Sequence, residues 1–168
     1  MSKPDFTHSG QLISPADNIF DRKALDVKID AVLESMSDGS KIRTSLVKIL
    51  TEARANGMAA IARSFAKKPF SAHPTTSSYS YLTDCLIETA YCAIVRHLYP
   101  TQFSTTGERL VLIAVGGYGR GEMAPFSDVD LLFVVPYKIT AWAENIVESL
   151  LYILWDLKIK VGHACRTI

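Results

Sequence analysis

The feature that most restricts the fold of this 168-residue chain is the segment AVGGYGRGEMAPFSDVDLLFVV (residues 114–135), in which a glycine-rich stretch separates two apolar runs. The first run, LVLIAV, covers residues 110–115, and the second, VDLLFVV, covers residues 129–135. Continuous apolar runs of this length are typical of strands that are covered on both faces. We therefore expect two buried strands joined by a glycine turn.

The chain before this segment shows the three-to-four-residue periodicity of amphipathic helices. The pattern predicts a short helix over residues 21–36, a longer helix over 40–67 and a third over 79–98. Ser40 is expected to cap the longer helix. Gly57, inside the longer helix, indicates a close approach of another segment. Residues 71–78 are rich in Ser, Thr and Pro, and this composition predicts a linker.

After the second apolar run, the pattern predicts a helix over 140–156 and the beginning of a third strand over 158–161. This order of elements predicts an α/β (α+β) domain with a mixed sheet, which is incomplete where the chain ends. We expect a loose amino-terminal arm over residues 1–20, a helical region over 21–106 that packs on the sheet domain, and the core of that domain over 107–168.

Composition excludes several classes of protein. The net charge of +1 gives no electrostatic reason to expect binding to nucleic acid or to a membrane surface. No apolar run approaches the roughly 20 residues of a membrane span, and the start, MSKPDFTHSGQLISP, lacks the apolar stretch of a secretory signal. The three cysteines form no CxxC pair. We expect a cytoplasmic protein with reduced thiols.

Gly116 and Gly117 follow directly on the first apolar run. Paired glycines allow unusual backbone conformations and carry no side chain, so backbone N–H groups can approach a phosphate closely. A dinucleotide-binding fingerprint is excluded, because a count from Gly117 meets Glu122 in place of its third glycine. A P-loop is excluded too, because Glu122 and Met123 stand where Lys and Ser or Thr are required. The glycines predict a phosphate-binding turn of another kind.

An acidic pair, Asp128 and Asp130, opens the second apolar run. Residues two apart on a strand point to the same face, roughly 7 Å apart, and two carboxylates there repel each other unless a cation lies between them. Mg²⁺ prefers carboxylate and phosphate oxygens, and two-metal sites hold their ions about 4 Å apart. The pair predicts a site for two Mg²⁺ ions. Taken separately, the glycines also fit a simple tight turn, and the acidic pair a solvated strand start.

The spacing of these residues resembles that of a known superfamily. A strand, two glycines, ten further residues and Asp-x-Asp on the next strand are similar to nucleotidyltransferases of the DNA-polymerase-β type. The strings LIAVGGYGRGEMAPFSDVDLLFV, LYILWDLKIKVGHACRTI and YLTDCLIETAYCAIVRHLYP resemble one family, the bifunctional uridylyltransferase/uridylyl-removing enzymes of the nitrogen-regulatory PII protein. The resemblance is strong from Tyr79 onwards, weaker over residues 57–70 and absent at the amino terminus.

The resemblance also assigns roles by position. It implies a nucleotidyltransferase fold in which catalytic Mg²⁺ is bound by Asp128 and Asp130. It further implies that the nucleotide is contacted by a set of residues from the glycine turn and the following loop: Gly116, Gly117, Arg120 and Ser127. The serine in this set shapes the turn rather than performing chemistry.

The reaction that the resemblance implies is transfer of UMP from UTP to a tyrosine hydroxyl of the PII protein, with release of pyrophosphate. Members of the family continue into a hydrolase domain that removes UMP and into domains that sense glutamine. The superfamily also uses a third carboxylate on a later strand, whereas Glu144, Glu148 and Asp156 all fall on the expected helix over 140–156. We therefore expect this chain to be a part of the transferase that is inactive alone.

Two other functions are compatible with the sequence. Another nucleotidyltransferase of the same fold, such as an adenylyltransferase of glutamine synthetase or of a small molecule, has the same two-strand motif. Only the longer strings favour uridylyl transfer over these. A non-catalytic regulatory module would keep nucleotide binding without the chemistry.

Overall fold

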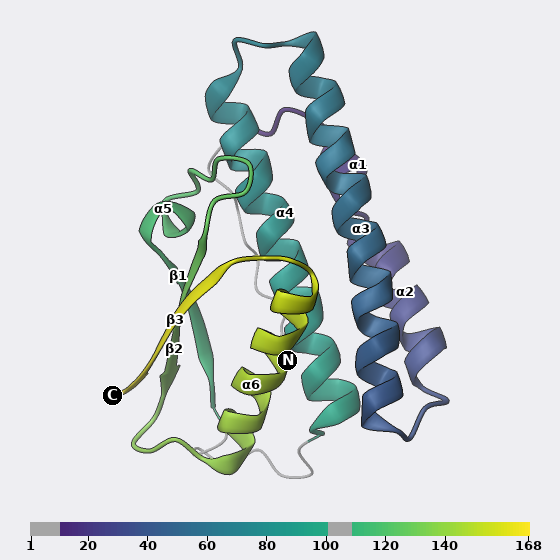
Figure 1. The fold of residues 1–168 in the computed structure, drawn as a ribbon, viewed down its shortest axis with the longest axis vertical. Coiled ribbons are helices and arrows are strands. Elements are labelled where there is room, and N and C mark those ends of the chain that lie inside the picture. The colour runs from purple at the N-terminus through teal and green to yellow at the C-terminus, as the bar shows by residue number, and fades with distance from the viewer. Residues whose placement is uncertain (1–10, 101–108) are drawn as a thin grey trace.

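The computed structural model describes residues 11–100 and 109–168, and Figure 1 shows a group of helices beside a small sheet. The helical part contains α1 (Ala16–Ile19), α2 (Arg22–Leu33), α3 (Gly39–Lys67), α4 (Ala72–Ala93) and a π-helical turn, η1 (Ile94–Leu98). The sheet-bearing part contains β1 (Val111–Val115), α5 (Gly116–Gly119), β2 (Val129–Val135), α6 (Ala141–Asp156) and β3 (Val161–Thr167). The α/β fold with a mixed sheet is confirmed.

The sheet has the order β1-β2-β3, with β2 in the centre. β1 pairs antiparallel with β2, and β3 pairs parallel with β2 because the chain crosses over through α6. The register places Val115 of β1 opposite Asp130, and Gly162 of β3 opposite Asp130 from the other side. The central strand thus carries an acidic residue that both neighbouring strands flank.

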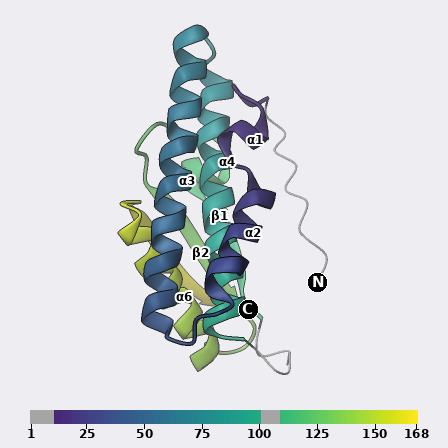
Figure 2. The same cartoon turned by 90° about the vertical axis from the view of Figure 1, so that its right-hand side faces the viewer.

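The core lies between one face of the sheet and the long helices. Leu131 and Phe133 of β2 are 3% and 0% exposed, and they belong to the same apolar cluster as Leu50 of α3, Leu86 of α4 and Ile146 of α6. Figure 2 shows α3 and α4 side by side along the long axis of the molecule. Because strand residues alternate between faces, Asp130 lies on the opposite, outer face of the sheet.

β1 differs from the expectation that both of its faces are covered. Val111, Ile113 and Val115 are 53%, 41% and 36% exposed, whereas Leu112 and Ala114, which alternate with them, pack against the core. Among the described residues, β1 pairs only with β2 and in an antiparallel manner, and such a strand can leave one face to solvent. An apolar run alone cannot distinguish this arrangement from a strand covered on both faces.

The sequence predicted a loose arm over residues 1–20, but the segment 11–20 contributes Ile13, Ile19 and Phe20 to the core. Ile19 and Phe20 are 2% and 3% exposed, and the Ile13 N–H donates a hydrogen bond to Ser78 Oγ at 3.0 Å. These apolar residues show no helical period because α1 is a single turn that packs against α3. The remainder of the predicted arm, residues 1–10, lies outside the described residues.

The linker predicted over residues 71–78 is wrong, because α4 begins at Ala72. Pro74 lies in the first turn, where its missing N–H leaves no helical hydrogen bond unmade. The hydroxyls of Thr75 and Ser78 donate to the carbonyl oxygens four residues earlier, each at 2.7 Å. Because several of its hydroxyl groups bond to its own backbone and Ser77 bonds to the His73 side chain, this segment can be helical and partly buried despite a composition typical of loops.

The first residues of two further elements, α3 and β3, also differ from those predicted from the sequence. α3 begins at Gly39, and the Asp38 carboxylate accepts a hydrogen bond from the Ser40 N–H at 2.9 Å, so Asp38 and not Ser40 caps the helix. The third strand begins at Val161, later than expected, because Lys158 adopts a left-handed conformation with φ of 60° and still belongs to the turn after α6.

Gly57 marks a close approach, as the sequence predicted: a Cβ there would lie 2.6 Å from Leu82 Cδ1 and 2.7 Å from the Ile19 carbonyl oxygen. We expect Gly57→Ala to lower the free energy of unfolding by about 1–3 kcal/mol, because a backbone oxygen cannot rotate away. Gly39→Ala is the matched control, since its Cβ would meet only Leu98 Cδ2, at 3.5 Å. Urea unfolding followed by circular dichroism compares the two, and equal stabilities would contradict the prediction.

Candidate functional site

The glycine turn and the acidic pair meet at one end of β2. β1 ends at Val115, α5 forms a single helical turn directly after it, and a loop leads from α5 to β2. Because Val115 pairs with Asp130, Gly116 comes to lie beside that aspartate. The structure thus brings together the two motifs that the sequence analysis singled out.

The Asp130 carboxylate lies in a space that two glycines leave open. A Cβ at Gly116 would lie 2.7 Å from Asp130 Oδ2, and a Cβ at Gly162 would lie 2.5 Å from Oδ1. Gly116 also has a φ of 64°, which favours glycine. Asp130 is half-buried, and within the described residues no hydrogen-bond donor or cation pairs with its carboxylate. Both glycines are therefore required for the observed position of this carboxylate.

Asp128 lies one residue before β2 and is exposed. Carboxylate oxygens suit a hard cation such as Mg²⁺, and a bound cation would stabilise a half-buried carboxylate without a partner, as Asp130 is. The described ranges hold no group of three or more His, Cys, Asp or Glu side chains that could bind a metal. The pair thus fits Mg²⁺ as part of a ligand set, to which phosphate or water oxygens would add.

The other two glycines of α5 differ in the space around them. A Cβ at Gly119 would lie 2.5 Å from the Ala114 carbonyl oxygen, so Gly119 allows the turn to fold back onto β1. A Cβ at Gly117 would meet nothing closer than the Glu122 carbonyl oxygen, at 3.7 Å, which is an ordinary contact. The fold explains Gly119, but it does not explain the lack of a side chain at Gly117.

Arg120 holds the glycine turn in shape. Its guanidinium donates a hydrogen bond to the Gly116 carbonyl oxygen at 3.0 Å and pairs with Glu122 at 3.3 Å between Nε and Oε2. Both side chains of the ion pair are exposed, so the pair itself contributes little to stability. The guanidinium lies beside the turn, where its remaining N–H groups can face solvent or a ligand.

Tyr118 anchors the glycine turn to the helical region. Its ring is buried, and its hydroxyl donates a hydrogen bond to Asp84 Oδ1 on α4. Burial, together with the neighbouring carboxylate of Asp84, raises the pKa of Tyr118 well above its ordinary value, so the hydroxyl keeps its proton. The role of Tyr118 was not predicted from the sequence, although an aromatic side chain inside a glycine-rich turn is a signal that the turn packs against another element.

Ser127 lies in the loop just before Asp128. Its N–H donates a hydrogen bond to the Ala124 carbonyl oxygen at 3.1 Å, which closes a turn that includes Phe126 in the left-handed region, with φ of 66°. Ser127 also lines a cavity beside α3 and α4. These contacts agree with a role in shaping the turn.

β3 offers no third carboxylate beside the acidic pair. The residue that faces Asp130 across the β2–β3 pairing is Gly162, and the strand VGHACRT contains no Asp or Glu. Between β2 and β3 the acidic residues all lie on α6: Glu144, Glu148 and Asp156. The last of them approaches Arg43 of α3, with Oδ2 4.0 Å from Nε.

Comparison with known proteins places the site within a domain family. The nucleotidyltransferase domain matches residues 100–162, which include the glycine turn and the acidic pair. A bifunctional uridylyltransferase/uridylyl-removing enzyme of Ruegeria pomeroyi is 51% identical over 150 residues, covering 89% of this chain and 16% of the relative. An enzyme of the same name from Cereibacter sphaeroides is 44% identical over 159 residues, which cover 94% of this chain and 17% of the relative. Another from Rhodospirillum rubrum is 41% identical over 150 residues, which cover 89% of this chain and 16% of the relative.

These alignments extend further than the resemblance seen in the sequence alone. A match over 150 residues includes much of the helical region before Tyr79, where the sequence motifs indicated only a weak resemblance or none. In the described part of the chain, no helix is long and apolar enough to cross a membrane. The chain carries a nucleotidyltransferase domain, and it is similar to the bifunctional uridylyltransferase/uridylyl-removing enzymes over the sixth of their length that it spans.

Proposed function

We propose that this chain is part of a cytoplasmic enzyme that transfers UMP from UTP to a tyrosine of the PII protein and releases pyrophosphate. The observation that carries the proposal is the Asp130 carboxylate, which lies unpaired between Gly116 and Gly162 beside the glycine turn. The printed name of the relatives supports uridylyl transfer. The PII acceptor and a glutamine response in further domains follow from the family resemblance.

The proposed roles of the residues follow from their positions. Asp128 and Asp130 would hold Mg²⁺, and the chemistry that the ion would supply is neutralisation of phosphate charge. Gly116 and Gly117 let the backbone approach the triphosphate, and Arg120, fixed across the turn, offers its free N–H groups to a phosphate oxygen. Because the acceptor tyrosine supplies the nucleophile, no Ser or Cys nucleophile is required in this chain.

The proposal is tested by transfer of label from α-³²P-UTP to purified PII protein. We expect label transfer by a chain extended to the length of the relatives and none by the 168-residue chain, because the resemblance implies a third carboxylate on a later strand and β3 contains no Asp or Glu. Equal rates for the two chains would show that a third carboxylate is dispensable or already present. Transfer from α-³²P-ATP instead of UTP would overturn the proposed nucleotide.

A substitution at Gly117 can distinguish a role of this glycine in phosphate binding from a role in folding. The protein has room for a side chain at this position, so we expect Gly117→Val to fold normally and yet to lose most transfer activity in the extended enzyme, because the side chain blocks the nucleotide. Circular dichroism and label transfer measure the two effects. Gly117→Ala should lose less, and a folded valine variant with near wild-type transfer would show that Gly117 does not contact phosphate.

A further inference from the structure

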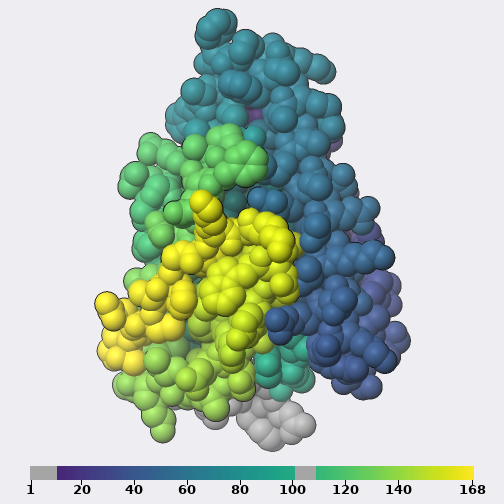
Figure 3. All heavy atoms as spheres, in the orientation of Figure 1, coloured from purple at the N-terminus to yellow at the C-terminus, as the bar shows by residue number. Residues whose placement is uncertain are grey.

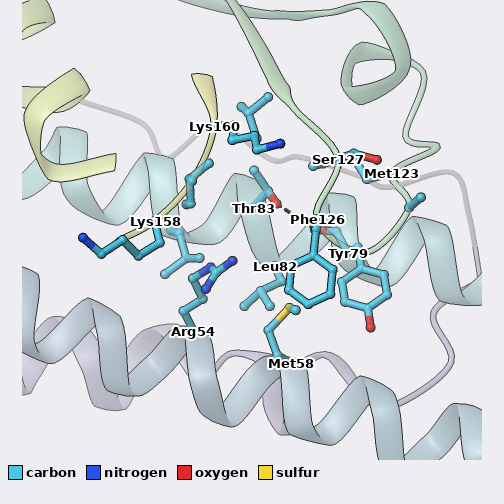
Figure 4. A pocket seen from close by; sticks show the side chains of 14 residues that line it. Arg54, Met58, Tyr79, Leu82, Thr83, Met123, Phe126, Ser127, Lys158 and Lys160 are labelled. Atoms are coloured by element: carbon cyan, nitrogen blue, oxygen red, sulfur yellow. Dashed lines mark hydrogen bonds between the residues drawn. The ribbon is translucent and has the colours of Figure 1, made fainter. Parts of the chain in front are cut away.

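A second concave site lies on the side of β2 opposite Asp130. Val129, whose side chain alternates with that of Asp130, lines a cavity of about 130 Å³. The walls come from α3 and α4, from the loop before β2 and from the turn between α6 and β3 (Figure 4). In the space-filling view, the hollow lies between the green loop, the yellow turn and the blue α3 helix (Figure 3). The cavity therefore lies on the other face of β2 from the Asp130 carboxylate, and the two sites share only the loop that contains Ser127.

Positive charge gathers at this cavity without any acidic side chain to balance it. Arg54, Lys158 and Lys160 are among the lining residues, and none of the lining residues is Asp or Glu. Arg54 is half-buried, and within the described ranges its guanidinium has no hydrogen bond or ion pair. Figure 4 shows Arg54 reaching up from α3 toward the cavity, whereas the Lys158 ammonium points outward. A half-buried guanidinium without an acceptor favours an anionic ligand.

The other side of the cavity is apolar and aromatic. Figure 4 shows the Phe126 ring beside Tyr79 and above Met58, with Leu82 behind them. Phe126 is 79% exposed and has a φ of 66°, a conformation that a bulky residue rarely adopts. This backbone conformation holds an exposed ring over the cavity. Aromatic faces of this kind can stack on a planar apolar group.

We propose that this cavity binds a small organic anion with a planar apolar body, whose carboxylate or phosphate pairs with Arg54 and Lys160 and whose body lies against Phe126. One water needs roughly 10–15 Å³, so a cavity of about 130 Å³ takes a molecule of about ten non-hydrogen atoms. The loop that carries Phe126 leads directly into Asp128, so the bound anion would contact the segment that positions the acidic pair.

Phenyl phosphate is a probe of this size and chemistry. The chain has four methionines, of which Met58 and Met123 line the cavity, whereas Met36 lies near Ser45, between α2 and α3. In the 168-residue chain labelled with ¹³C at the methionine methyl groups, we expect phenyl phosphate, without Mg²⁺, to shift the signals of Met58 and Met123 in a saturable way and to leave Met36 unchanged. Inorganic phosphate lacks the aromatic ring and phenol lacks the phosphate group, so each should shift the signals of Met58 and Met123 much less.

Charge variants locate the anion. Arg54→Gln should weaken binding of phenyl phosphate about tenfold or more, because a hydrogen-bonded charge pair is lost, and the exposed Lys160→Gln should weaken it less. Arg63→Gln is the matched control, since Arg63 lies exposed on the same helix outside the cavity. Equal binding by the Arg54 and Arg63 variants, or equal shifts with phenol, would overturn the proposal. Asp128→Asn with Asp130→Asn should not change these shifts, so the result is independent of the proposed nucleotide site.

Discussion

Replacing Asp128 and Asp130 together by asparagine is expected to abolish the strengthening of UTP binding by Mg²⁺ and to leave the fold intact. Both side chains lie outside the apolar core, Asp128 exposed and Asp130 half-buried on the outer face of the sheet. Loss of a residue that merely supports a metal ligand costs roughly 10–100-fold in metal affinity. Loss of both proposed ligands should therefore remove the whole effect of the metal.

Calorimetry of UTP binding with and without Mg²⁺ measures this effect. The matched control is Glu144→Gln with Glu148→Gln, which removes two negative charges from exposed positions on α6. The control should keep the wild-type response to Mg²⁺, because a general change in charge acts only weakly through solvent. An unchanged Mg²⁺ effect in the Asp128 and Asp130 double variant would show that the metal binds elsewhere.

Gly162→Ala is expected to displace the Asp130 carboxylate and thereby to lower the activity of the proposed site. Gly162 itself has no side chain that could take part in the reaction. The added methyl would lie 2.5 Å from Asp130 Oδ1, so the carboxylate must rotate or the strands must separate. A displacement of about 1 Å at a reacting centre can cost about a hundredfold in rate. We expect a loss of that size in UMP transfer by the extended enzyme.

The control for Gly162→Ala is Ala164→Ser, which adds one atom on the same face of β3, two residues further along, opposite Leu132. Transfer rate and the Mg²⁺ dependence of UTP binding should both fall in the alanine variant at position 162 and stay near wild type in the control. A Gly162→Ala enzyme with full activity would mean that Asp130 functions equally well in another rotamer.

Much of the fold could be predicted because its signals are local. Helical periodicity located α2 and α3, the change to apolar runs located β1 and β2, and Gly57 indicated a close approach without identifying its neighbours. The spacing of the glycines and the acidic pair placed both motifs at the same end of two adjacent strands, and the register of β1 and β2 bears out that placement.

What the sequence could not supply depends on pairing between distant segments. The role of Gly162 as a neighbour of Asp130 follows only from the parallel register of β2 and β3, which no local pattern encodes. The exposure of one face of β1 depends on its place at the sheet edge. The helical start of α4 depends on hydroxyl groups that donate to their own helix, and one of them, Ser78 Oγ, also accepts a hydrogen bond from the Ile13 N–H.

The hydrogen bond from Tyr118 to Asp84 crosses the boundary at residue 106 that the sequence predicts between the helical region and the sheet domain. One partner belongs to the glycine turn and the other to α4, so the helical region fixes the position of the turn and is not a separable appendage. A chimaera that joins the sheet of this chain to the helices of another protein must therefore keep a hydrogen-bond acceptor at position 84 for Tyr118. Otherwise a buried tyrosine hydroxyl is left without its acceptor, and the turn loses its attachment to the helices.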